Sequence, residues 1–254
     1  METTILFQEW TREECLTKSP NTLVVMPVGA TEQHGPHLPV GTDHFAVEYI
    51  SRHAAVTAAK NIPIVVAPTL PFGSSHHHIP FGGTMSLNTD TYYRVLYELA
   101  ESLILGGFRK IFIVNGHGGN QELVQLVARD LALKHPVHFA AASYWVTAWE
   151  AMIKVTASGP SRMPGHAGMF ETCLVMALRP DLIRAPMPHR EIKDLPQLSL
   201  HRRYRIESHD SWQAFDGYTD SPDLAREDLG QSYLKAIVRS MAEAFVEFYE
   251  SVAC

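Results

Sequence analysis

The sequence has little cysteine: Cys15, Cys173 and Cys254 are an odd number in 254 residues, and no two lie close together. This excludes a disulfide framework and a zinc site built from closely spaced thiolates. Long apolar runs are also missing, since the best stretch, residues 23–30, is far shorter than the roughly 20 residues that a spanning helix needs. We therefore expect reduced thiols and no insertion into a membrane.

Positive charge is scarce as well. Twenty-one Lys and Arg stand against 27 Asp and Glu, which gives a net charge of −6, and no long basic run occurs. This pattern argues against a nucleic-acid partner. Residues 1–16 lack a basic start and an apolar core and carry several Glu, so they do not resemble a signal peptide, and we expect a cytoplasmic location.

The hydrophobic pattern predicts strands that alternate with helices. Strands are predicted at residues 21–31, 62–67, 110–115 and 137–143. Helices are predicted at residues 43–58, 89–105, 120–134, 168–178 and 221–252. This alternation is typical of parallel βαβ units, which need helices on both faces of the sheet. We expect an α/β fold in a single domain over residues 1–254, with residues 185–217 mostly irregular.

Histidine, in contrast, is abundant, with 14 residues. Glu32 and His34 follow the first predicted strand and are two apart, so an extended backbone places both side chains on one side. Asp43 begins the next helix, and His117 follows a different strand. These residues fall at the carboxyl edge of the sheet, where α/β folds bind ligands, and their side chains suit Zn²⁺, Mn²⁺ or Fe²⁺. The alternatives are a solvated rim position for Glu32 and a helix cap for Asp43.

Three segments resemble motifs of the creatininase (creatinine amidohydrolase) family. Residues 27–43 contain PVGATEQHGPHLP followed by GTD, residues 115–120 read NGHGGN, and residues 165–172 read GHAGMFET. The resemblance implies a three-layer α/β/α fold with a mainly parallel central sheet. It also implies two divalent metal ions, hydrolysis of amide C–N bonds in small molecules, and often a hexamer built as a trimer of dimers.

Carried over by position, the resemblance implies that Glu32, Asp43 and His117 hold one ion. His34 and Asp43 would hold the second, so that Asp43 bridges the two. Two such ions can share a water molecule, lower its pKa toward about 7 and polarise a carbonyl, so that metal-bound hydroxide attacks. No Ser or Cys nucleophile is then needed, in agreement with the absence of a Gly-x-Ser-x-Gly elbow.

One ligand is missing from this pattern, because Gly119 stands where creatinine-hydrolysing members carry a Glu. We expect Glu171 to replace it; the alternative is an acid that only complements a helix dipole. Glu122 is a poorer candidate, since it is expected to face water. An amide nitrogen must be protonated to leave, and His166 is our candidate proton donor, with a structural His as the alternative.

Three residues are candidate substrate contacts. Trp145 lies in a segment that resembles the one whose Trp covers the ring in creatinine enzymes. Arg162 replaces a second Trp of those enzymes, and either pairs with a substrate carboxylate or phosphate or lies in solvent. His78 is the best placed of three consecutive His to reach the substrate, with a surface-loop position as the alternative.

The sequence therefore predicts a metal-dependent amidohydrolase for a small cyclic amide, formamide or similar polar substrate, acting on C–N bonds other than peptide bonds. Creatinine itself is not favoured. One alternative is a family member that opens a cyclic keto-polyol ring by C–C hydrolysis. Another is a phosphate or nucleotide binder that uses residues 116–120, although these lack a GxGxxG pattern and a P-loop Lys. A homo-oligomer is expected from the resemblance.

Overall fold

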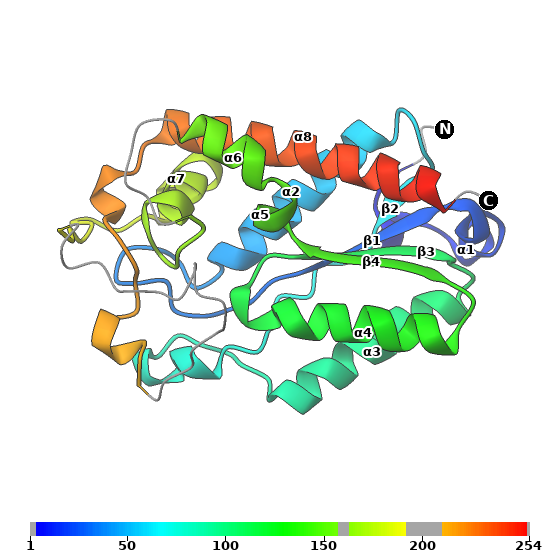
Figure 1. The fold of residues 1–254 in the computed structure, drawn as a ribbon, viewed down its shortest axis with the longest axis horizontal. Coiled ribbons are helices and arrows are strands. Elements are labelled where there is room, and N and C mark those ends of the chain that lie inside the picture. The colour runs from blue at the N-terminus through cyan, green and yellow to red at the C-terminus, as the bar shows by residue number, and fades with distance from the viewer. Residues whose placement is uncertain (1–3, 157–162, 192–209, 253–254) are drawn as a thin grey trace.

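The centre of the molecule is a parallel sheet of four strands in the order β2-β1-β3-β4 (Figure 1). The computed structural model describes residues 4–156, 163–191 and 210–252. The strands are β1 (Leu23–Val28), β2 (Ile64–Val66), β3 (Lys110–Asn115) and β4 (His138–Ser143). Because all four run in the same direction, their carboxyl ends meet at one edge of the sheet.

Helices cover both faces of this sheet, which confirms the predicted three-layer α/β/α fold (Figure 1). One layer contains α2 (Thr42–Ala58), α5 (Tyr144–Thr147), α6 (Trp149–Val155), α7 (Met169–Leu178) and α8 (Glu227–Ser251). The other contains α3 (Thr89–Leu105) and α4 (Gln121–Lys134). A short helix, α1 (Arg12–Lys18), precedes the sheet. No helix in the described part of the chain is long and apolar enough to cross a membrane.

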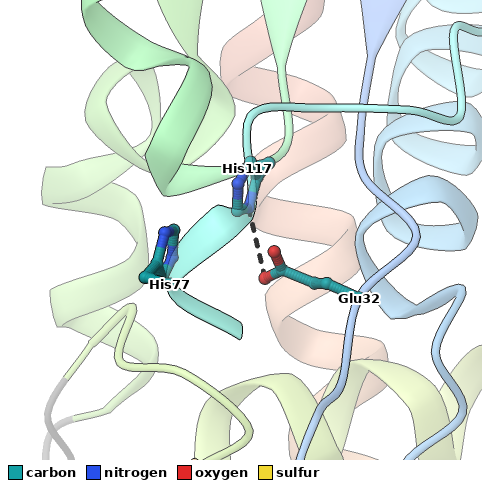
Figure 2. Close-up of side chains that lie close together, drawn as sticks. All are labelled: Glu32, His77 and His117. Atoms are coloured by element: carbon teal, nitrogen blue, oxygen red, sulfur yellow. Dashed lines mark ion pairs between the residues drawn. The ribbon is translucent and has the colours of Figure 1, made fainter. Parts of the chain in front are cut away.

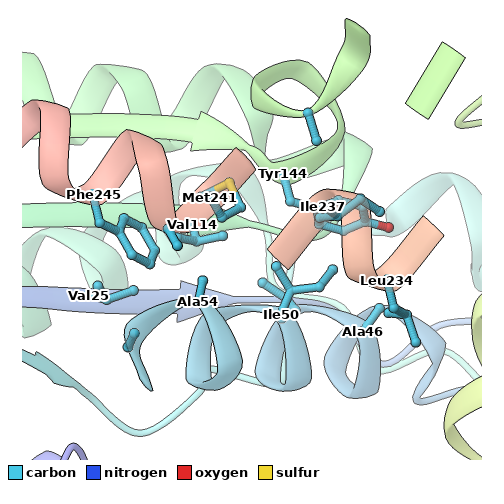
Figure 3. Packing of buried hydrophobic residues seen from close by; sticks show 14 of the residues in the cluster. Val25, Ala46, Ile50, Ala54, Val114, Tyr144, Leu234, Ile237, Met241 and Phe245 are labelled. Atoms are coloured by element: carbon cyan, nitrogen blue, oxygen red, sulfur yellow. The ribbon is translucent and has the colours of Figure 1, made fainter. Parts of the chain in front are cut away.

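Successive residues of β1 pack into opposite layers, because side chains alternate along a strand. Val25 belongs to the core shared with α2 and α8, where it lies with Ile50 and Phe245 (Figure 3). Val24 belongs to the core shared with α3 and α4. Burial on both faces explains why the strand reads as a continuous apolar run. The strand ends that carry the candidate site are therefore anchored in two cores.

The observed elements differ from the predicted ones in three ways. Helix α2 begins at Thr42 with Gly41 at its N-cap, so the expectation that Asp43 caps this helix was wrong. The closing helix is shorter than predicted, because a 3-10 turn at Pro222–Leu224 is followed by two extended residues before α8 starts. Sequence reasoning also missed α1, α5 and α6, although a capping box between Thr11 and Glu14 marks the start of α1.

Candidate metal centre

The four predicted ligands meet at the carboxyl edge of the sheet. Glu32 and His34 follow β1, Asp43 lies in the first turn of α2, and His117 follows β3; all four are buried. Asp43 Oδ1 lies 3.2 Å from His34 Nε2, and Asp43 Oδ2 lies 3.1 Å from His117 Nδ1. Glu32 Oε1 is 3.2 Å from the same His117 nitrogen. Asp43 thus presents one oxygen to each imidazole, the arrangement expected of a bridging carboxylate.

Backbone carbonyls fix which nitrogen of each imidazole carries the proton. His34 Nδ1 lies 3.1 Å from the carbonyl oxygen of Glu32, and His117 Nε2 lies 3.2 Å from that of Ser74. A carbonyl oxygen only accepts, so each of these nitrogens donates. In the neutral rings the lone pairs then lie on the opposite nitrogens, His34 Nε2 and His117 Nδ1, and both of these nitrogens face the carboxylates. Metal-binding His residues are commonly oriented in this way, by a hydrogen bond from the nitrogen that does not bind the ion.

The carboxylates are buried without matching donors. Both side-chain oxygens of Glu32 and Oδ2 of Asp43 have no hydrogen-bond partner among the described residues, although Glu32 Oε1 and Asp43 Oδ2 lie near His117 Nδ1. Burial alone would lower the pKa of His34, but Asp43 and Glu171 raise it to about 10. Without an ion, protons must therefore neutralise the cluster. The donor set fits divalent cations, which would replace those protons.

Glu171 joins this cluster from the first turn of α7. Its Oε2 lies 3.6 Å from His34 Nε2, and the two residues form with Asp43 a group whose ligand atoms lie within 4.8 Å of one another. Burial, together with the Asp43 carboxylate, raises the pKa of Glu171 to about 8. Its Oε2 also accepts the N–H of Ala167, just before α7. Glu171 therefore belongs to the cluster and also interacts with the backbone at the start of its helix. Glu122, by contrast, is exposed on α4.

Two more predicted residues, His78 and His166, form one wall of the cluster through Gln33. The Gln33 amide donates to the Gly217 carbonyl and to His78 Nδ1, at 3.0 and 2.8 Å. His166 Nε2 then donates to the backbone carbonyl of Gln33 at 3.0 Å, and its Nδ1 faces Glu32 Oε1 at 3.6 Å. Burial lowers the pKa of both imidazoles, that of His78 to about 3. A neutral His166 therefore accepts a proton at Nδ1 before it can donate one.

Sequence reasoning missed Gln33 and Trp212. Gln33 lies between two predicted ligands, so strict alternation along the strand would point its side chain away from them. Trp212 comes from the segment expected to be irregular, and its ring centre lies 4.8 Å from that of His78 and 5.3 Å from that of His166. No pattern in the sequence connects this residue to the site.

Of the two remaining predicted substrate residues, Trp145 and Arg162, the structure describes Trp145. Trp145 lies in α5, where it packs edge-on against Tyr144 with ring centres 5.0 Å apart and contacts the core beneath α8. Its role as a pocket wall stays a prediction. Arg162 lies outside the described residues.

The loop at residues 116–120 is tied to its neighbours rather than open to an anion. The Asn115 side chain donates to the His117 carbonyl at 2.7 Å. The Asn120 side chain accepts the Ser74 N–H and donates to the Gly29 carbonyl. The buried carboxylates beside this loop also oppose a phosphate. The geometry therefore speaks against the phosphate-binding alternative.

Comparison with known proteins agrees with this geometry. The family model Creatininase, described as creatinine amidohydrolase, matches residues 8–245. The chain belongs to the creatininase family. The creatinine amidohydrolase of Pseudomonas putida is 25% identical over 261 residues, which cover 94% of each chain. A crystal structure of creatinine amidohydrolase covers 97% of this chain and 98% of its own, with a TM-score of 0.78 at 23% identity.

Other proteins to which the chain is similar carry different names. The mycofactocin precursor peptide peptidase of Mycobacterium tuberculosis H37Rv is 34% identical over 172 residues, or 63% of this chain and 60% of the relative. The 3-dehydro-scyllo-inosose hydrolase of Thermotoga maritima is 30% identical over 165 residues, or 63% and 51%. These matches thus span only about half to three fifths of the relatives' lengths. Similar solved structures include a manganese form of creatininase and a zinc–zinc form of a mutant.

Proposed function

We propose that this protein is a metal-dependent hydrolase that cleaves a C–N bond of an amide in a small polar substrate. The observation that carries the proposal is a buried cluster in which backbone carbonyls turn one nitrogen each of His34 and His117 toward carboxylates, while both Glu32 oxygens and Asp43 Oδ2 have no hydrogen-bond partner among the described residues. Such a set is costly to bury unless a cation compensates the charge. We assign one ion to Glu32, Asp43 and His117, and a second to His34, Asp43 and Glu171.

The bound ions would supply polarisation of the substrate carbonyl and a water molecule with a lowered pKa. His166 accepts a proton at Nδ1, beside Glu32, and returns it to the leaving nitrogen. Its Nε2 hydrogen bond to the Gln33 carbonyl holds the ring in that orientation. His78 and Trp212 form the adjacent wall, where the substrate is expected to lie. His166 thus acts as base first and as acid second.

The similarity to a peptide peptidase removes the reason to restrict the substrate to bonds other than peptide bonds. We therefore include short peptides with cyclic amides and formamides. A second candidate is opening of a cyclic keto-polyol ring, which the similarity to an inosose hydrolase supports. The two reactions differ in product, because only amide cleavage frees a nitrogen from its acyl carbon: as a separate amine or ammonia from an open-chain amide, and within the ring-opened product from a cyclic amide.

A substrate panel with metal analysis tests the proposal. The protein is purified without chelator, reconstituted with Mn²⁺ or Zn²⁺, and offered formamides, lactams, creatinine, short peptides and a keto-polyol. We expect about two equivalents of metal and cleavage of an amide C–N bond, seen as a released amine or as a ring-opened product. Asp43→Ala should lose both metal and activity, whereas the exposed Glu122→Gln should keep both. A wild-type protein that binds no metal, or that retains full activity after chelation, would refute the proposal.

A further inference from the structure

A further imidazole, that of His77, lies beside Glu32 and His117 and belongs to none of the three family motifs. His77 lies in a 3-10 helix at His76–Phe81, and its ligand nitrogen is within 4.8 Å of ligand atoms of both Glu32 and His117. Figure 2 shows the three side chains pointing into the same space from three separate segments. The His77 and His117 rings are nearly parallel, 4° apart in orientation, with centres separated by 6.0 Å.

The loop that carries His77 also holds His117 from behind. Ser74 and Ser75 contact His117 Nε2 through a carbonyl at 3.2 Å and a hydroxyl at 3.1 Å. Asn120 in turn accepts the Ser74 N–H at 3.0 Å. His77 follows these two residues and lies with its ring nearly parallel to that of His117, within reach of Glu32. One short loop therefore orients the His117 ring and also places the His77 ring beside it.

Position 119 cannot supply the ligand instead. A Cβ added to Gly119 would lie 2.2 Å from the Ser74 carbonyl oxygen and 2.6 Å from His117 Nε2. These distances are far below van der Waals contact, so the packing of this loop requires glycine. A carboxylate at position 119 and the observed position of Ser74 exclude each other.

The neighbouring imidazoles are less suited to this ion. His78 receives the Gln33 amide on Nδ1, so in its neutral form the nitrogen near Glu32 carries a hydrogen and has no lone pair. His166 offers Nδ1 to Glu32 but groups with His34 rather than with His117. His77 is the imidazole that groups with both Glu32 and His117 among the described residues.

We propose that His77 is a further ligand of the ion held by Glu32 and His117. The inference rests on the proposed function, because it requires a cation at that place. It adds a nitrogen donor to a site that otherwise has one imidazole and two carboxylates. Such a donor favours Zn²⁺ or Co²⁺ over harder cations.

Metal binding by His77→Ala tests this assignment, with His76→Ala as the matched control. His76 is the preceding residue of the same 3-10 helix, is exposed, and bonds Ser86. We expect the wild type and His76→Ala to bind two Zn²⁺ in a calorimetric titration. In His77→Ala, one of the two should bind at least about tenfold more weakly. His77→Glu restores a donor and should recover much of that affinity.

The Co²⁺-loaded proteins give a second readout that does not depend on activity. The visible absorption of Co²⁺ reports its ligands, so His77→Ala and His77→Glu should change the spectrum and His76→Ala should not. Unchanged Zn²⁺ affinity and an unchanged Co²⁺ spectrum in His77→Ala would overturn the assignment of His77 alone. A wild-type protein that binds no ion would overturn the proposed function as well.

Discussion

Gly119→Ala should destabilise the protein, whereas Gly118→Ala should not. The added methyl group would lie 2.2 Å from the Ser74 carbonyl, a backbone atom, so the loop itself must shift. Overpacking of this kind costs about 3 kcal/mol at the upper end of its usual range. For a chain of this size we expect the Tm to fall by roughly 6–12 °C, at about 2–4 °C for each kcal/mol.

Gly118 provides the matched control, because it is the adjacent residue of the same turn and a Cβ there meets no atom within 4 Å. Neither glycine has a positive φ, so backbone strain does not separate the two variants. Thermal unfolding of the metal-free proteins measures the difference. Gly118→Ala should match the wild type or gain up to about 1 kcal/mol from the unfolded state. Equal Tm values for both variants would refute the close packing of Ser74 on this turn.

Four further substitutions test the roles of individual side chains. Glu171→Gln should keep the Ala167 hydrogen bond but bind about half the metal, as elemental analysis would show; full occupancy would contradict its assignment. His166→Ala should reduce kcat by about 10²-fold or more with both ions retained, and a parallel loss of metal would make it a ligand instead. Trp212→Ala should raise KM with little change in Tm, because Trp212 packs against His166. Trp145→Ala should lower Tm, because Trp145 packs against the core. A raised KM with an unchanged Tm in Trp145→Ala would instead support its predicted place in the substrate pocket.

The residues attached directly to strand ends were predictable from the sequence. Glu32 and His117 follow β1 and β3, and two parallel strands that pair side by side must place their carboxyl ends together. Hydrophobic periodicity is enough to find those strands, so it is enough to bring these ligands to one edge. The resemblance to family motifs added Glu171, whose place depends on the entry into α7.

Side chains whose direction depends on loop closure were not predictable. Three consecutive His offer no periodicity, and only the turn from Ser75 through the 3-10 helix decides that His77 and His78 face inward while His76 faces out. The roles of Gln33 and Trp212 likewise depend on contacts between segments more than 40 residues apart. Interactions of that range leave no local signal in a single sequence.

The packing of Gly119 against Ser74 makes the turn after β3 and the loop before the 3-10 helix a single structural unit. A carboxylate cannot be introduced at position 119 while Ser74 keeps its place against His117. Gly119→Glu should therefore fail to restore the metal affinity lost in His77→Ala, even though it adds the same kind of donor as His77→Glu. If calorimetry showed that the double variant His77→Ala/Gly119→Glu binds two ions as well as His77→Glu does, the loop would be free to move aside. The ligand would then be interchangeable between the two segments, and the steric argument for His77 would fall.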